Sequence, residues 1–125
     1  MFTIDTDKTI HITRGDTGVI AVSANKTETE PYVFQPEEVV RFTVFVAKQH
    51  DNVVLEKNTI ITEETVSADI GLDQIDTTIG DIINKPTDYW YEVVLNPDTV
   101  PQTIIGYDKA GPKIFRLYPE GGGRK

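Results

Sequence analysis

Apolar residues alternate with other residues along two stretches of the chain, and we expect these stretches to form the centre of the fold. In residues 39–47 every second residue is apolar: Val40, Phe42, Val44 and Val46. This period of two predicts a β-strand with one face packed against a core. The positions between them mix apolar, polar and charged side chains, which predicts a partly covered second face. Residues 89–95 alternate in the same way, so the two strands are predicted to form the middle of a β-sandwich.

Shorter alternating runs predict the remaining strands. They are residues 9–13, 19–24, 53–57, 59–62, 66–70, 102–107 and 113–118. Turns that contain glycine predict one hairpin between residues 9–13 and 19–24, and another between residues 102–107 and 113–118. About eight short strands separated by turns predict an all-β fold, namely an antiparallel β-sandwich of immunoglobulin-like or jelly-roll-like type.

Two segments leave more than one arrangement open or depart from the strand pattern. Residues 59–62 and 66–70 fit either two strands or one strand broken by a turn. Between Leu72 and Ile83 the apolar residues recur near helical spacing, but Gly80 interrupts the pattern. The segment 72–83 is therefore predicted to hold one short helical turn.

The 125 residues are enough for one domain with a core of its own, which we place at residues 1–119. Residues 120–125 contain three consecutive glycines and predict a flexible C-terminal tail. There is no cysteine, which excludes disulfides and thiolate metal ligands. A net charge of −8 repels the phosphate backbone, so we expect no nucleic acid as a partner. No apolar run reaches the ~20 residues of a membrane helix, so we expect no membrane contact either.

The residue types needed for catalysis are sparse or badly spaced. Ser23 and Ser67 are the only serines, and neither lies in a Gly-x-Ser-x-Gly turn. Asp88 and Glu92 lie along the same predicted strand, and this spacing does not place their carboxylates on opposite sides of a cleft. We therefore expect no enzyme and no cofactor.

Metal ligation is not predicted. His11 and His50 lack a second ligand at zinc spacing, and we assign both to the surface. Asp73, Asp76 and Asp81 lack the pattern of a calcium loop, so helix and turn capping is their expected role.

The tripeptide Arg14-Gly15-Asp16 matches an integrin-binding motif, but it lies between two predicted strands. We expect turn chemistry instead, with Gly15 or Gly18 at positive φ and Asp16 bonding the backbone of the loop.

Aromatic residues supply the one candidate site. Tyr89-Trp90-Tyr91 is the densest aromatic cluster, and an outward Trp90 would offer a platform for a sugar or a partner chain. Packing of Trp90 into the second face of a covered sheet is the arrangement we expect, and the platform is the alternative. The residues of this candidate interface or ligand platform are Trp90, Glu92, Tyr107 and Tyr118.

The order of the motifs resembles a known family. Along the chain come a Gly-Asp-Thr turn at 15–17, a Val-x-Phe-x-Val strand at 40–44 and Tyr-x-Tyr-Glu at 89–92, before Gln102-Thr103-Ile104-Ile105. This order resembles the small β-sandwich domains of bacteriophage tail proteins, in particular the N-terminal module of baseplate upper proteins.

The resemblance implies a structural or adaptor protein of a phage tail or baseplate, or of a prophage remnant. Its partners would be other virion proteins or further copies of itself in a homo-oligomer, and it would be located in the virion or, before assembly, in the cytoplasm of the bacterial host. Two alternatives belong to other classes. One is a small acidic phage-encoded inhibitor of a host enzyme, and the other is a carbohydrate-binding module that uses exposed aromatic residues such as Trp90.

Overall fold

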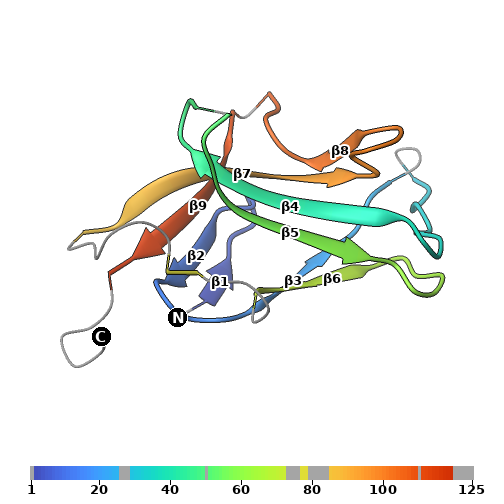
Figure 1. The fold of residues 1–125 in the computed structure, drawn as a ribbon, viewed down its shortest axis with the longest axis horizontal. Helices are drawn as coiled ribbons and strands as arrows, with labels where there is room; N and C mark the ends of the chain where they lie inside the picture. Colours follow the sequence, from blue (N-terminus) through green and yellow to red (C-terminus); the bar gives the residue numbers. More distant parts are fainter. Residues whose placement is uncertain are drawn as a thin grey trace.

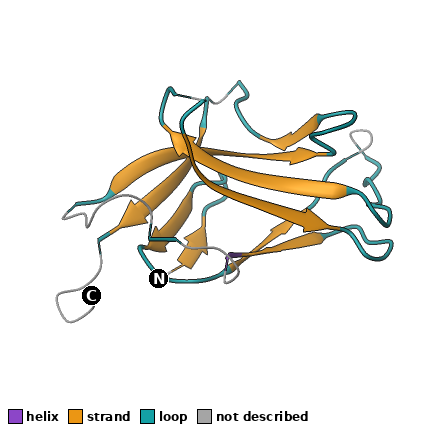
Figure 2. Cartoon of the chain, in the orientation of Figure 1, coloured by secondary structure: helices purple, strands orange, loops and turns teal. Residues whose placement is uncertain are grey.

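The computed structural model describes residues 2–25, 29–49, 51–72, 77–78, 85–109 and 111–119. Within them the chain forms nine strands (Figures 1 and 2), which confirms an all-β fold. The strands are β1 (Phe2–Ile4), β2 (Ile10–Thr13), β3 (Val19–Val22), β4 (Val39–Val46), β5 (Val53–Ile60), β6 (Ala68–Gly71), β7 (Thr87–Leu95), β8 (Gln102–Ile105) and β9 (Lys113–Tyr118). Of the helical turn expected over residues 72–83, only Leu72, Thr77 and Thr78 are described. The expected tail, residues 120–125, lies outside the described residues.

The strands form two sheets. The large sheet has the order β1-β2-β9-β7-β4-β5, with β8 also paired to β7, and the small sheet consists of β3 and β6. Figure 1 shows the small sheet on one side of the large sheet. Buried side chains from both sheets form one hydrophobic core. None of the described helical residues forms a segment long and apolar enough to cross a membrane.

The prediction that residues 39–47 and 89–95 form central strands is confirmed. β4 pairs with β5 on one edge and with β7 on the other, so residues 39–47 and 89–95 are adjacent in the middle of the large sheet. On the inner face of β4, Val40, Phe42 and Val44 are fully buried and Val46 is partly buried. The ring of Phe42 lies 5.6 Å from that of Tyr91 and 6.2 Å from that of Phe115. Burying a side chain such as Phe42 contributes about 1.5–3 kcal/mol, so this three-strand contact anchors the sheet.

The large sheet is mixed, and the prediction of a purely antiparallel sandwich is wrong at one seam. β2 runs parallel to β9, with Ile10 opposite Phe115 and Ile12 opposite Leu117. All four of these side chains are fully buried. β2 and β9 each bring alternate apolar residues to the core, as strands of either orientation can, so the alternation seen in the sequence did not reveal the parallel pairing.

The first predicted hairpin is also wrong. β2 pairs with β1 and β9, whereas β3 pairs with β6 in the other sheet. The turn at residues 14–18 leads the chain from the large sheet to the small sheet. At its start Arg14 N donates to Tyr118 O of β9 at 3.0 Å, and at its end Gly18 O accepts from Leu72 N, next to β6, at 2.8 Å. Residues 9–13 and 19–24 therefore alternate in the predicted way but face each other across the core.

β8 and β9 do not form the predicted hairpin with each other. Both pair with the same edge of β7, β9 along Thr87–Tyr91 and β8 along Val93–Leu95. β8 and β9 lie end to end along that edge of β7. The chain between them, residues 106–112, departs from the edge at the level of Glu92. We call residues 106–112 the excursion. Gly111 in it has φ +102°, a backbone conformation that glycine adopts without a steric penalty.

Candidate functional site

A pocket lies where the excursion turns back over β7. It has a volume of about 160 Å³. We call it the aromatic pocket, and its lining residues are Phe45, Lys48, Trp90, Tyr91, Glu92, Tyr107, Pro112 and Lys113. The Trp90 ring lies edge to face with Phe45 at 6.4 Å and with Tyr107 at 5.8 Å between centroids. Three aromatic rings from β4, β7 and the excursion thus form one continuous apolar surface.

Strand alternation explains the direction of Trp90. On β7 the neighbouring Tyr91 is buried, and its hydroxyl donates a hydrogen bond to the backbone oxygen of Lys8. Burial, followed by the charge of Asp7, raises the pKa of Tyr91 well above its ordinary value of 10.0. Because adjacent side chains on a strand point to opposite faces, Trp90 faces away from the core. Phe45 is opposite Trp90 in the β4–β7 register and shares that outer face.

The excursion that brings Tyr107 to Trp90 is fixed at its base. Asp108 and Gly111 exchange two backbone hydrogen bonds, at 2.9 and 3.1 Å. The nearly buried ammonium of Lys113 lies 2.8 Å from the carboxylate of Asp108. These contacts define the shape of the loop, and they leave Tyr107 72% exposed on its outer side.

The aromatic pocket belongs to a longer apolar row on the outer face of the large sheet. The residues opposite one another across neighbouring strands are Val53, Phe45, Trp90 and Ile114, from β5, β4, β7 and β9. We call these four residues the apolar row. Val53 is 48% exposed, although it is apolar and lies on an edge strand. No described strand pairs with the other edge of β5, so the apolar row ends at an open edge.

Polar residues flank the apolar row on both sides. On one side Glu56, Thr43 and Glu92 are opposite one another on β5, β4 and β7. On the other side Asp88 of β7 is opposite Arg116 of β9, which is opposite His11 of β2. An apolar strip with a polar margin is the usual composition of a protein interface.

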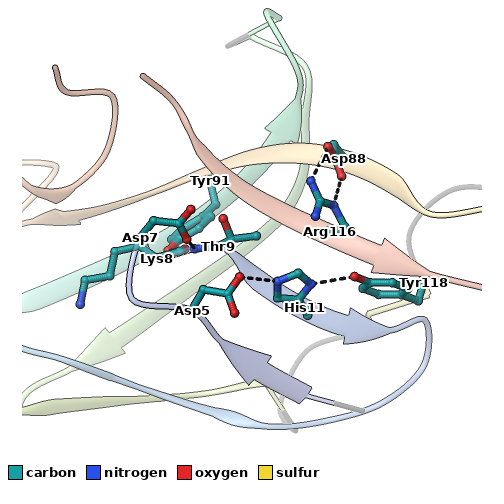
Figure 3. A network of polar contacts seen from close by, with 9 residues as sticks. All are labelled: Asp5, Asp7, Lys8, Thr9, His11, Asp88, Tyr91, Arg116 and Tyr118. Carbon is teal, nitrogen blue, oxygen red and sulfur yellow. Dashed lines mark hydrogen bonds and ion pairs between the residues drawn. The ribbon is translucent and has the colours of Figure 1, made fainter. Parts of the chain in front are cut away.

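The second polar margin is a connected network (Figure 3). The Arg116 guanidinium donates to both carboxylate oxygens of Asp88, at 2.7 and 3.2 Å. His11 is hydrogen-bonded through Nε2 to Asp5 at 2.8 Å and through Nδ1 to the Tyr118 hydroxyl at 2.7 Å. Hydrogen bonding to Asp88 raises the pKa of Arg116. Asp5, on the loop after β1, is thereby joined to strands β2 and β9.

The structure brings three of the four candidate residues together. Trp90, Glu92 and Tyr107 line the aromatic pocket, whereas Tyr118 lies apart from it in the polar network. Trp90 matches neither of the two arrangements set out from the sequence, because it is half-buried between two aromatic edges. It is not an open flat platform, and it is not covered by another layer.

The other sequence predictions are met in part. Gly15 has φ +88°, which confirms the positive φ of the turn at Arg14-Gly15-Asp16. His11 points outward from its strand as expected, but its side chain is only 15% exposed because Asp5 and Tyr118 enclose it. His50, Asp73, Asp76 and Asp81 lie outside the described residues.

Sequence reasoning did not single out Phe45, Val53 and Ile114 as members of the site. Phe45 was visible as an apolar residue on the mixed face of its strand. Val53 and Ile114 carried no such signal, because their place beside Phe45 and Trp90 depends on register across three strand pairs.

Among the described residues, no group of three or more histidine, aspartate or glutamate side chains is placed to hold a metal ion. Comparison of the chain with protein-family models, with curated proteins and with solved structures finds no match.

Proposed function

We propose that this protein is a structural adaptor of a bacteriophage tail or baseplate, or of a prophage remnant, and that it self-associates through the outer face of its large sheet. The observation that carries the proposal is the apolar row with its aromatic pocket, which lies on a face that the small sheet does not cover. The sequence resemblance to baseplate modules suggests that the assembly is a phage tail or baseplate. The outer face of the large sheet is the surface through which copies of the chain would bind one another.

The size of the aromatic pocket supports a side chain as its occupant. A cavity of about 150 Å³ holds one benzene-sized group, and the aromatic pocket has about 160 Å³. Sites for larger small molecules are typically about 300–1,000 Å³. Trp90 and Tyr107 are residue types that contribute strongly to binding energy in interfaces. One apolar side chain of a partner, seated beside these rings, fits this pocket.

The charges around the apolar row favour a second copy as the partner. The chain as a whole carries −8, which repels another copy at long range. The margins of the apolar row carry both signs instead, with Glu56 and Glu92 on one side and the Asp88–Arg116 ion pair on the other. A margin with both signs can pair with itself under two-fold symmetry. The open edge of β5 lies beside the same face and adds backbone groups for pairing.

The inhibitor alternative depends on clustered carboxylates. In the described part of the chain, carboxylates pair with cations at separate places: Asp88 with Arg116, Asp98 with Arg41 and Asp108 with Lys113. Asp5 is hydrogen-bonded to His11 at a further place. This dispersal favours the adaptor over an inhibitor that presents one acidic face.

Trp90 gives a direct test, because it is the only tryptophan in the chain. Its emission is measured over a dilution series of the purified protein. We expect emission at shorter wavelength at high concentration, because association removes water from the aromatic pocket. Emission that stays the same across the series would contradict self-association through this face. Val100→Ala is the control, since Val100 is 69% exposed on a distant turn and its loss leaves the dilution curve unchanged.

A further inference from the structure

A second cavity lies between the two sheets at one end of the sandwich, away from the aromatic pocket. It has a volume of about 450 Å³, within the range typical of small-ligand sites. Its lining residues are Ser23, Ala24, Asn25, Tyr32, Leu95, Gln102, Thr103 and Ile104. They come from the end of β7, from β8 and from the segment after β3, which Figure 1 shows rising towards β8. We call this space the end cavity.

The lining of the end cavity is polar but uncharged. Its polar lining residues are Ser23, Asn25, Gln102 and Thr103. Gln102 is opposite the buried Leu95 and shares its face, so its amide points between the sheets, whereas the side chain of Thr103, the next residue on β8, points to the opposite face beside Gly106. Among the described residues that line it, none carries a charge, although 26% of the chain is charged. Leu95 and Ile104 provide apolar surface beside these groups. Hydroxyls and amides both donate and accept hydrogen bonds, so the end cavity offers both roles to a ligand.

The aromatic wall of the end cavity is held in place before any ligand arrives. The Tyr32 hydroxyl donates to Glu38 Oε2 at 2.7 Å, and its ring packs edge to face with Phe34 at 5.4 Å. The same carboxylate oxygen accepts from Asn96 Nδ2 at 2.9 Å. Tyr32 N also donates to Ala24 O at 2.9 Å, which joins the ring to the segment after β3. A preorganised ring lowers the entropic cost of binding.

The chemistry of the lining selects among ligand classes. An anion would need a cationic side chain, and the described residues of the lining include none. An apolar side chain from a partner would bury polar groups of the lining, such as the Gln102 amide, without hydrogen bonds, which is costly for each group. A pyranose ring of a neutral saccharide has hydroxyl groups around its edge and apolar C–H faces. It satisfies the amides and hydroxyls while covering Tyr32, Leu95 and Ile104.

We propose that the end cavity binds a pyranose ring of a neutral saccharide, with Asn25 and Gln102 as hydrogen-bonding residues and Tyr32 as its aromatic wall. This site is separate from the aromatic pocket and does not depend on self-association. Tyr32 and Glu38 act as a positioning pair, because the hydrogen bond between them fixes the ring.

The test is NMR titration of the full chain with methyl glycosides of glucose, galactose, N-acetylglucosamine and rhamnose. The probes are the side-chain amide signals of Asn25 and Gln102 and, in parallel, Trp90 emission. Glycerol at equal concentration is the control for nonspecific polyol effects. We expect saturable shifts of both amide signals with at least one glycoside, with no change in Trp90 emission.

Matched substitutions locate the binding. Gln102→Ala and Asn25→Ala each remove one amide of the lining, and each is expected to weaken binding about fivefold. Thr103→Val, at the next residue of β8 but on its opposite face, is expected to leave binding unchanged. Gln49→Ala and Thr99→Val make the same chemical changes at exposed positions outside the end cavity and are expected to leave binding unchanged. The proposal is overturned if no glycoside gives saturable shifts, or if glycerol gives the same shifts. It is also overturned if the response appears in Trp90 emission instead, or if the control variants lose as much affinity as the test variants.

Discussion

The Trp90 and Tyr107 rings meet edge to face, 5.8 Å apart at an interplanar angle of 60°, although Tyr107 lies on no strand. The contact exists because β8 and β9 share one edge of β7 and the excursion between them turns back over the outer face. An interruption in strand pairing thus creates the aromatic pocket. Without it, Trp90 would lie open on the sheet.

Replacing Tyr107 by alanine is expected to expose Trp90 while the fold is kept. An aromatic pair adds about 0.5–1.5 kcal/mol beyond burial, and Tyr107 buries little surface because it is 72% exposed, so the free energy of unfolding should fall by about that amount. Acrylamide quenching of Trp90 in dilute protein should increase, and its emission should move to longer wavelength. Tyr107→Phe keeps the ring and is the matched control. Quenching that is equal in Tyr107→Ala and wild type would show that Tyr107 does not shield Trp90.

The stability of the protein should fall in acid partly because of Glu38. Burial raises the pKa of Glu38, but hydrogen bonds from Gln35 N, Tyr32 and Asn96 outweigh that effect and hold the pKa below its ordinary value of 4.5. A carboxylate with a lowered folded pKa stabilises the fold above its unfolded pKa, and this stability is lost as the pH falls through the folded value. Urea unfolding from about pH 6 to pH 3 measures the fall. Glu38→Gln should show a shallower fall, and equal slopes in the two proteins would contradict this role.

Tyr91 should resist ionisation until the protein unfolds. Its raised pKa means that the folded state favours the protonated phenol, so stability is unaffected below the ordinary value of 10.0 and declines as the pH rises above it. Absorbance titration near 295 nm is expected to show a tyrosine that titrates late, together with the loss of the fold. In Tyr91→Phe this late step should be missing. Titration of every tyrosine near its ordinary pKa in folded protein would contradict the burial of Tyr91.

The Arg116–Asp88 pair should contribute little to stability despite its two hydrogen bonds. Both side chains are substantially exposed, at 36% and 44%, and solvent screens their attraction. A double-mutant cycle with Arg116→Gln and Asp88→Asn is expected to give a coupling of less than about 1 kcal/mol. The coupling should decrease as salt is added, because screening acts on exposed charges. A larger coupling that does not depend on salt would indicate a buried pair.

The central strands of the fold were predictable because their pattern is local. Val40, Phe42 and Val44 alternate without interruption, and their burial follows from that period alone. Pairing partners were not predictable in the same way. The turn at residues 14–18 reads as a hairpin turn, but hydrogen bonds to Tyr118 and Leu72, both distant in sequence, direct its two ends to different sheets.

The residues of the candidate site also fall into two groups, those predictable from the local pattern and those that depend on strand pairing. Alternation around the buried Tyr91 places Trp90 and Glu92 on the outer face, so both could be identified from sequence. Tyr107 could be noted as an aromatic residue, but its contact with Trp90 depends on the excursion. Residues 102–107 and 113–118 each have strand character, and nothing local distinguishes two strands that pair with each other from two that share one edge of a third. The end cavity could not be predicted from the sequence, because Asn25 and Gln102 line the same cavity only through the arrangement of the two sheets.

The proposed self-association through the apolar row is tested most directly by sedimentation equilibrium of three proteins across a concentration series. They are the wild type, Val53→Lys and Ile60→Lys. Val53 belongs to the apolar row and is 48% exposed, whereas Ile60 is a more accessible apolar residue at the other end of β5, 64% exposed. We expect a defined oligomer for the wild type and for Ile60→Lys, and a monomer for Val53→Lys. A wild type that stays monomeric throughout, or a Val53→Lys variant that associates as the wild type does, would contradict the proposal.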